Sequence, residues 1–190
     1  MFQMVMVFIG LSLDNFVGMM HVASRIKGMN EAKFARDAGI FAFTSAAMLS
    51  LGYLVSLIIE PRVPDGSFQL FVASQLIIIN GILIILRGWF KKNMEEKLDK
   101  QWNQKKLCQM AVITNIDTFF VALAFALLGL PYFFGLILSF GVSFLAVMLA
   151  LNIGYRYGSQ FEKQISCFGG ILIVLFGFWI MHVSVIIKLM

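Results

Sequence analysis

Six long apolar runs, separated by short clusters of charged residues, constrain this chain more than any other feature of its sequence. The runs cover residues 3–24, 37–59, 68–90, 107–129, 132–154 and 166–187. About 20 apolar residues in a helix cross a hydrocarbon core of about 30 Å. Each run is therefore long enough for one membrane span, and 190 residues leave no room for a separate soluble domain.

The composition agrees with a chain that lies in lipid. Hydrophobic residues make up 60% of it, charged residues only 13%, and the mean hydropathy is +0.88. Soluble domains are about 45–50% apolar and about 25% charged. The composition therefore disfavours a water-soluble enzyme, a disordered chain and a nucleic-acid binder. The sequence predicts an all-α integral membrane protein of six transmembrane helices, with the lipid bilayer as its partner and no nucleic acid.

Basic residues are divided unequally between the connections. Of the 15 Lys and Arg residues, 13 lie in the first, third and fifth connections, counting Arg87 with the third, and 2 lie elsewhere. Positively charged connections stay on the cytoplasmic side of a membrane. This bias predicts that the first, third and fifth connections are cytoplasmic and that both termini face outside.

The two halves of the chain share short segments in the same order. Residues 80–90 align with residues 169–179 at six identities in eleven positions, and 49–53 and 12–16 resemble 151–155 and 115–119. The expected organisation is a three-helix repeat over 1–90, a cytoplasmic linker over 91–106 and a second repeat over 107–190. Since three spans are an odd number, the second copy enters the membrane from the opposite side and is inverted, as is typical of secondary transporters.

Two aspartates, Asp14 and Asp117, lie inside the first and fourth apolar runs at equivalent places in the two repeats. A carboxylate at that depth costs several kcal/mol unless it is paired, protonated, hydrated or bound to a cation. No basic residue is expected deep enough in any span to neutralise them. The two acids therefore favour binding of an external cation, or carriage of protons, between the two halves.

The neighbours of both aspartates are rich in oxygen and poor in sulfur. Carboxylate, carbonyl and hydroxyl ligands favour Mg, Ca or Mn over Zn or Cu. The predicted metal ligands are Asp14, Asp117, Asn15, Thr118, Ser12 and Asn115. The hydroxyl groups could equally hold helices together. His21, on the same face as Asp14, is either a metal ligand or proton relay or a histidine at the membrane interface.

With these residues in view, the chain resembles the MntP-type manganese efflux pumps of the LysE transporter superfamily. The family's Ser-Leu-Asp-Ala-type motif matches Ser12-Leu13-Asp14-Asn15 and Asn115-Ile116-Asp117-Thr118. The resemblance implies Mn²⁺ export across the plasma (inner) membrane, with both aspartates at the metal site and Mn²⁺ as cargo, not as a cofactor. The chain departs from the family at Asn15 and Thr118, where Ala or Ser is usual, and at Ser45, where many members carry Glu.

Three other functions compete with metal export. Two aspartates in a membrane could form a protease dyad, but the Tyr-Asp and Gly-x-Gly-Asp patterns of such proteases are missing around both, so we expect no enzyme. Export of a small organic solute and a non-transporting role in membrane assembly, as in a sporulation-associated branch, remain open. The leading prediction is alternating access around the two aspartates, with proton exchange as its coupling.

Overall fold

The structure is a computed structural model that describes residues 2–24, 31–59, 66–90, 104–157 and 162–189. Within these ranges it contains helices and turns and no strand. The helices are α1 (Phe2–Ala23), α2 (Glu31–Ile59), α3 (Gly66–Phe90), α4 (Gln104–Thr114), α5 (Ile116–Leu127), α6 (Tyr132–Tyr157) and α7 (Glu162–Leu189). Backbone groups bonded within helices satisfy the demand that lipid places on every N–H and C=O.

The six predicted spans are confirmed. Among the described residues, six stretches are long and apolar enough to cross a membrane, and α4 and α5 together form one of them, Leu107–Leu127. Residues 91–103 of the predicted linker lie outside the described residues, and α4 begins at Gln104. The inversion of the second repeat and the placement of both termini on the outer side of the membrane stay predictions.

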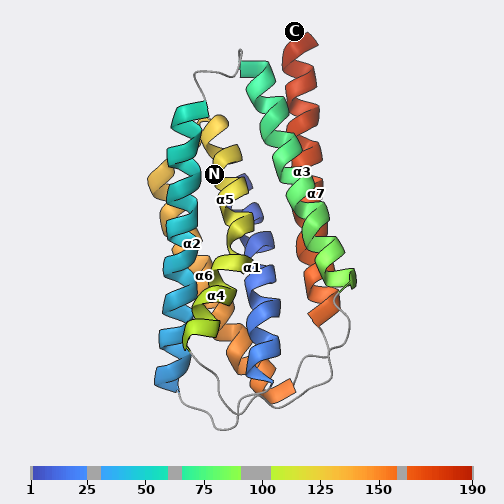
Figure 1. Ribbon diagram of the computed structural model, residues 1–190. Coiled ribbons are helices and arrows are strands. Elements are labelled where there is room, and N and C mark those ends of the chain that lie inside the picture. Colours follow the sequence, from blue (N-terminus) through green and yellow to red (C-terminus); the bar gives the residue numbers. More distant parts are fainter. Residues whose placement is uncertain (1, 25–30, 60–65, 91–103, 158–161, 190) are drawn as a thin grey trace.

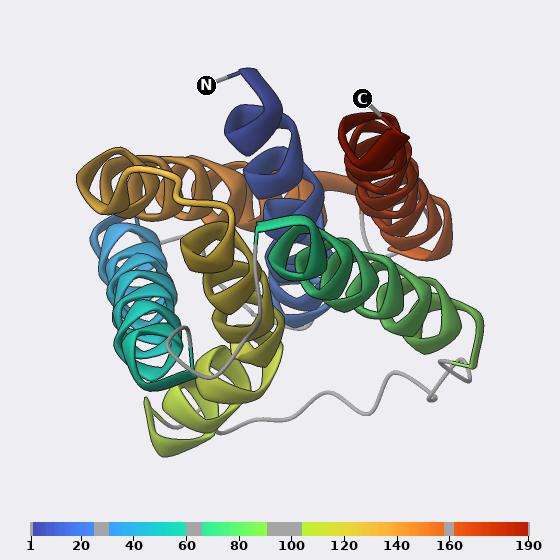
Figure 2. The ribbon, with the colours of Figure 1, turned by 90° about the horizontal axis from the view of Figure 1, so that it is seen from above.

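Two outer pairs of helices and two bridging spans, α1 and the span made of α4 and α5, make up the bundle (Figures 1 and 2). α3 lies beside α7, and α2 lies beside α6. α1 packs on both α6 and α7, whereas α5 packs on both α2 and α3. The bridging spans are the most enclosed: 67% of the apolar stretch in α1 and 56% of that in α4–α5 are buried, against 28–39% in the others. Both predicted aspartates therefore lie on the central spans.

Glycines let the helices approach closely. A Cβ atom built on Gly81 of α3 would lie 3.0 Å from the carbonyl oxygen of Gly170 in α7, and one on Gly170 would lie 2.9 Å from that of Gly81. Small residues at such crossings bring backbones together in membranes, where packing drives helix association. The two residues correspond in the predicted repeat, so equivalent positions meet at the α3–α7 contact.

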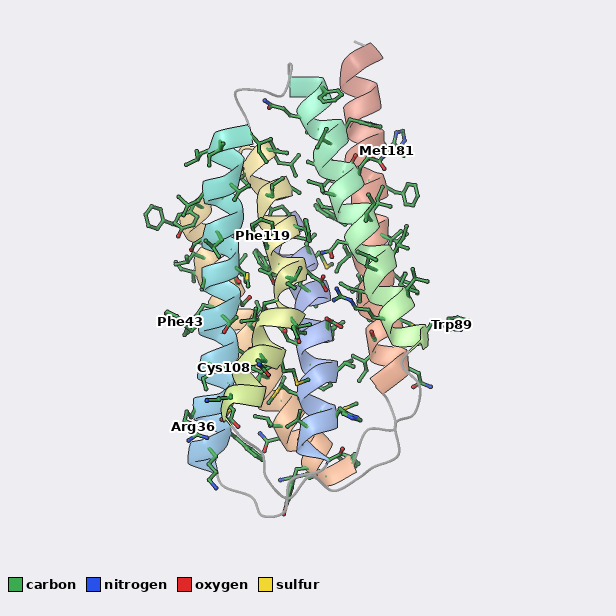
Figure 3. The ribbon with its side chains drawn as sticks, in the orientation of Figure 1. Arg36, Phe43, Trp89, Cys108, Phe119 and Met181 are labelled. Carbon is green, nitrogen blue, oxygen red and sulfur yellow. The ribbon has the colours of Figure 1, made fainter. Side chains whose placement is uncertain are left out.

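The outer surface of the bundle is apolar. Large exposed side chains such as Phe43, Leu54, Phe133 and Ile137 lie on α2 and α6, and Figure 3 shows Phe43 and Trp89 pointing away from the bundle. An apolar surface this extensive is unfavourable in water and suits contact with lipid tails. Among the described residues, thirteen polar or charged side chains are buried inside the bundle instead.

A tight turn joins the second bridging helix to α6. Gly129 adopts a positive φ of 66°, the left-handed conformation that ends many helices. The N–H of Leu130 donates to the carbonyl oxygen of Phe125 over 3.0 Å, and the N–H of Gly129 donates to the carbonyl oxygen of Ala126 over 2.9 Å. This turn contains no charged residue, as the sequence predicted for the connection after the fourth span.

Candidate cation site between α1, α3 and α5

One guanidinium nitrogen lies between the two buried aspartates. Nη1 of Arg87, on α3, donates a hydrogen bond to Oδ2 of Asp117 over 2.8 Å. The same nitrogen is 3.9 Å from Oδ2 of Asp14. The side chains of Asp117 and Asp14 are only 3% and 14% exposed, against 44% for Arg87. The structure therefore brings both aspartates to one place, and an arginine reaches them from a more exposed position.

The position of the Arg87 side chain contradicts one prediction from the sequence. We expected no basic residue deep enough to neutralise Asp14 or Asp117, and we counted Arg87 among the charges of the third connection. That expectation was wrong, because a long arginine side chain can carry its charge well away from its own backbone. A signal was present in the sequence: Arg87 is the only charged residue of α3, three positions before the helix ends.

The helix that carries Asp117 is interrupted directly before it. The predicted continuous span 107–129 is instead two helices, with α4 ending at Thr114 and α5 beginning at Ile116. Asn115 lies between them and caps α5 with φ −87° and ψ 4°. Asp117 is thus in the first turn of α5, where the partial positive charge of a helix N-terminus stabilises an anion. α1, which carries Asp14, is unbroken.

The two predicted motifs also meet through their amide side chains. Nδ2 of Asn15 donates to Oδ1 of Asn115 over 3.0 Å, and the hydroxyl of Thr118 donates to the same oxygen over 3.4 Å. All three side chains are buried. Three of the predicted residues around the aspartates therefore form one connected polar cluster between α1 and the start of α5. Their role as metal ligands stays a prediction.

Asn80 on α3 belongs to this cluster, although the sequence analysis did not place it in the predicted metal site. Its Nδ2 donates to the backbone carbonyl oxygen of Asp117 over 3.1 Å. Oδ1 of Asn80 and Oδ1 of Asn15 are both buried and accept no hydrogen bond from the described residues. Buried polar atoms are nearly always paired. These two amide oxygens are therefore free to accept a bond, and an oxygen atom is the kind of ligand that a hard cation prefers.

Two predicted residues are less closely tied to the cluster. The hydroxyl of Ser12 donates to the carbonyl oxygen of Ile9 on its own helix over 2.8 Å, which is a common local bond for serine within helices. His21 lies in the last turn of α1, about two helical turns beyond Asp14. A relay or ligand role for His21 and a ligand role for Ser12 stay predictions.

Ser45, where the resemblance implied a departure from the family, joins a separate buried cluster. Its Oγ lies 2.7 Å from Oγ of Ser139, and the hydroxyl of Ser143 donates to Ser45 over 3.1 Å. These three serines connect α2 to α6. Hydroxyl groups that bond one another in this way stabilise a helix contact, so these bonds hold α2 against α6.

The possible metal ligands at this site are few, and all of them are hard oxygen donors. Among the described residues, no group of three or more His, Cys, Asp and Glu side chains lies close enough together to hold a metal. The available donors are the two carboxylates, amide oxygens and a hydroxyl. Such oxygen ligands match Mg, Ca or Mn and are unlike the thiolate and imidazole sets of Zn and Cu.

Six membrane-spanning helices around a central charged cluster define a multi-pass membrane protein with a polar site in its interior. The chain belongs to the family described as "Mntp: Putative manganese efflux pump", whose model matches residues 28–181. This match includes Arg87 and Asp117 and begins after Asp14. The manganese-export resemblance read from the sequence is thereby confirmed at the level of the family.

Relatives of similar length match nearly the whole chain. A protein of Methanothermobacter thermautotrophicus named "Putative manganese efflux pump MntP" is 27% identical over 92% of both chains. A protein of Wolinella succinogenes named "Putative manganese efflux pump MntP 2" is 24% identical over 93% of this chain and 96% of its own. One of Methanosarcina acetivorans is 26% identical over 87% of each. No solved structure gives a significant match.

Proposed function

We propose that this protein exports Mn²⁺ across the plasma (inner) membrane by alternating access around Asp14 and Asp117. The observation that carries the proposal is the position of Arg87 Nη1, 2.8 Å from one carboxylate and 3.9 Å from the other. It marks a point inside the bundle where two negative charges from different helices favour a cation. A divalent ion at this point would balance both carboxylates.

Oxygen donors around this point support a hard divalent ion as cargo. Asp14 and Asp117 would supply the charged ligands, and the unpaired amide oxygens of Asn15 and Asn80 would supply neutral ones. Asn115 and Thr118 hold the interrupted span in place beside them. The names of the relatives add manganese as the particular ion.

The helix arrangement supports alternating access. α1 and α5 each bridge the two outer pairs, so relative movement of the pairs would change the surroundings of both aspartates. The reciprocal packing, with α1 on α6 and α7 and α5 on α2 and α3, agrees with the predicted inverted repeat. Halves that rock about a central site are the common mechanism of such transporters.

Proton exchange is the coupling that we include in the proposal. A carboxylate that has released its cation in a low-dielectric interior is stabilised by taking up a proton. Vesicles with an imposed pH gradient test this part alone. Manganese movement that is indifferent to the gradient would remove proton exchange and leave manganese export in place.

The cellular test is total manganese content in an export-deficient host under manganese load. Wild-type protein should lower manganese, with zinc and iron unchanged, and Asp14→Asn and Asp117→Asn should each abolish the effect. Asp37→Asn is the matched control, because Asp37 is also buried in a predicted span but pairs with Arg36 on its own helix. Unchanged manganese with confirmed membrane expression would contradict the proposal.

The Arg87–Asp117 ion pair itself favours a second function, a non-transporting membrane protein in which the pair only fastens α3 to α5. In that case the wild-type protein would not change the manganese content of the cell. The aspartate variants would only reduce the amount of folded protein. Measuring expression and manganese content together separates the two functions.

A further inference from the structure

Arg87 occupies the position that the transported cation would need. Its Nη1 reaches Oδ2 of both aspartates. Arginine does not lose its proton in proteins, so it cannot become neutral to make room for a metal. A guanidinium and a divalent ion repel one another and compete for the same carboxylate oxygens. One of them must leave before the other can bind there.

The guanidinium has a way to leave. Its side chain is 44% exposed, whereas the carboxylate of Asp117 is 3% exposed. Arg87 lies in the last turn of α3, on a long flexible stem that can extend towards water while the helix stays in place. The residue is thus a cation attached to the protein at the border between the buried site and the more exposed end of α3.

We propose that Arg87 is a tethered counter-cation, which Mn²⁺ displaces from Asp117 on binding and which returns when Mn²⁺ leaves. The inference rests on the proposed function and adds a positioning residue to it. With Arg87 in place, the empty site keeps one cation against its two carboxylates, which lowers the cost of burying them as the protein changes conformation. The same competition weakens Mn²⁺ binding and so favours release.

This role predicts opposite effects on affinity and turnover. Without the competing charge, Arg87→Gln binds Mn²⁺ more tightly, by about tenfold, within the usual range for coupled binding events. Its maximal transport rate falls, because the empty site has lost its resident cation. Arg87→Lys keeps the charge and retains an affinity near that of the wild type. A purely structural role would weaken binding, or leave it unchanged, in both variants.

Arginine-selective modification tests the displacement in the wild-type protein, with no variant that has to fold. Purified full-length chain is treated with phenylglyoxal with and without MnCl₂, and modification at each arginine is measured by mass spectrometry. Mn²⁺ should increase the rate at Arg87 severalfold. Arg36 is the internal control, because its side chain is 48% exposed and it pairs with Asp37 on its own helix. Its rate should not change.

The outcomes separate this inference from the proposed function. Saturable Mn²⁺ binding that leaves Arg87 modification unchanged or lowers it overturns the counter-cation role while manganese transport stands. Unchanged or weaker Mn²⁺ affinity in folded Arg87→Gln overturns it as well. Wild-type protein that neither binds nor transports Mn²⁺ overturns the proposed function and this inference together.

Discussion

Arg87 donates a hydrogen bond to Asp117 over 2.8 Å, although the two residues are thirty positions apart and lie on different helices. The pair joins α3 of the first half of the chain to α5 of the second. Asp14 completes the arrangement from α1, at 3.9 Å from the same nitrogen. Three helices therefore contribute one charge each to a single interior point, and the proposed cation site rests on that convergence.

Cys108 offers a direct test of membrane orientation. It is exposed and lies on α4 in the lower half of the view in Figure 3, next to the connection predicted to be cytoplasmic. With Cys167 replaced by Ser, a membrane-impermeant thiol reagent should label Cys108 in inverted vesicles and not in intact cells.

The matched control for this labelling places a cysteine at the other end of the bundle. Pro131→Cys, in a background without Cys108 and Cys167, lies in the exposed turn before α6 and should react in intact cells. The reverse pattern for both positions would mean that the positive-inside assignment is wrong.

Gly170 tests the close contact between α3 and α7. A Cβ atom there would lie 2.5 Å from a side-chain carbon of Ile85 and 2.9 Å from the Gly81 carbonyl oxygen. Gly170→Ala should lower the free energy of unfolding by about 1–3 kcal/mol, the usual cost of overpacking. Thermal unfolding in detergent measures the change.

Gly141→Ala is the control, because a Cβ atom on Gly141 meets no other atom within 4 Å. Alanine also favours a helix over glycine by about 1 kcal/mol, so this variant should be as stable as the wild type or slightly more so. Equal stability of both variants would show that α3 and α7 do not pack as closely as described.

Asn80 tests the amide contribution to the site. Asn80→Ala removes the donor to the Asp117 carbonyl and one unpaired acceptor. We expect the KM for Mn²⁺ to rise at least about fivefold, because losing a buried hydrogen bond costs about 1–3 kcal/mol. Gln75→Ala, on the same helix but bonded to Met181, should leave KM unchanged. Similar KM values in the two variants would remove Asn80 from the site.

Ser45 tests whether the position at which the resemblance implied a departure from the family acts in transport. Its hydroxyl bonds only to Ser139 and Ser143 among the described residues. Ser45→Ala should lower stability by about 0.5–1.5 kcal/mol and leave the rate of Mn²⁺ transport per folded molecule unchanged. A lost transport rate at unchanged stability would place Ser45 on the path of the ion.

The sequence predicted the six spans and the meeting of the two aspartate motifs, because apolar run length and matching segments report these features directly. It did not predict that Arg87 turns inward. In the sequence, Arg87 lies close to Lys91 and Lys92 and so resembles part of a basic cluster at the membrane interface. Only the packing of α3 on α5 directs the Arg87 side chain to Asp117. The interruption at Asn115 was also missed, since neither Gly nor Pro marks it.

Ser12 and Asn80 illustrate a further limit of pattern reading. Both are polar residues within apolar runs, and the sequence alone favoured Ser12 because it adjoins Asp14. In the structure Ser12 bonds to its own helix, whereas Asn80 reaches the backbone of Asp117 from a different span. Proximity along the chain is a poor guide to a site that is assembled from three helices.

The most direct test of the account is Mn²⁺ flux through purified protein in vesicles that contain a fluorophore quenched by manganese. Wild-type protein should produce saturable quenching on addition of MnCl₂, and Asp37→Asn should match it. Asp14→Asn and Asp117→Asn, incorporated in equal amounts, should give no more quenching than vesicles without protein. Flux through the two aspartate variants at the wild-type rate would contradict a cation site between Asp14 and Asp117.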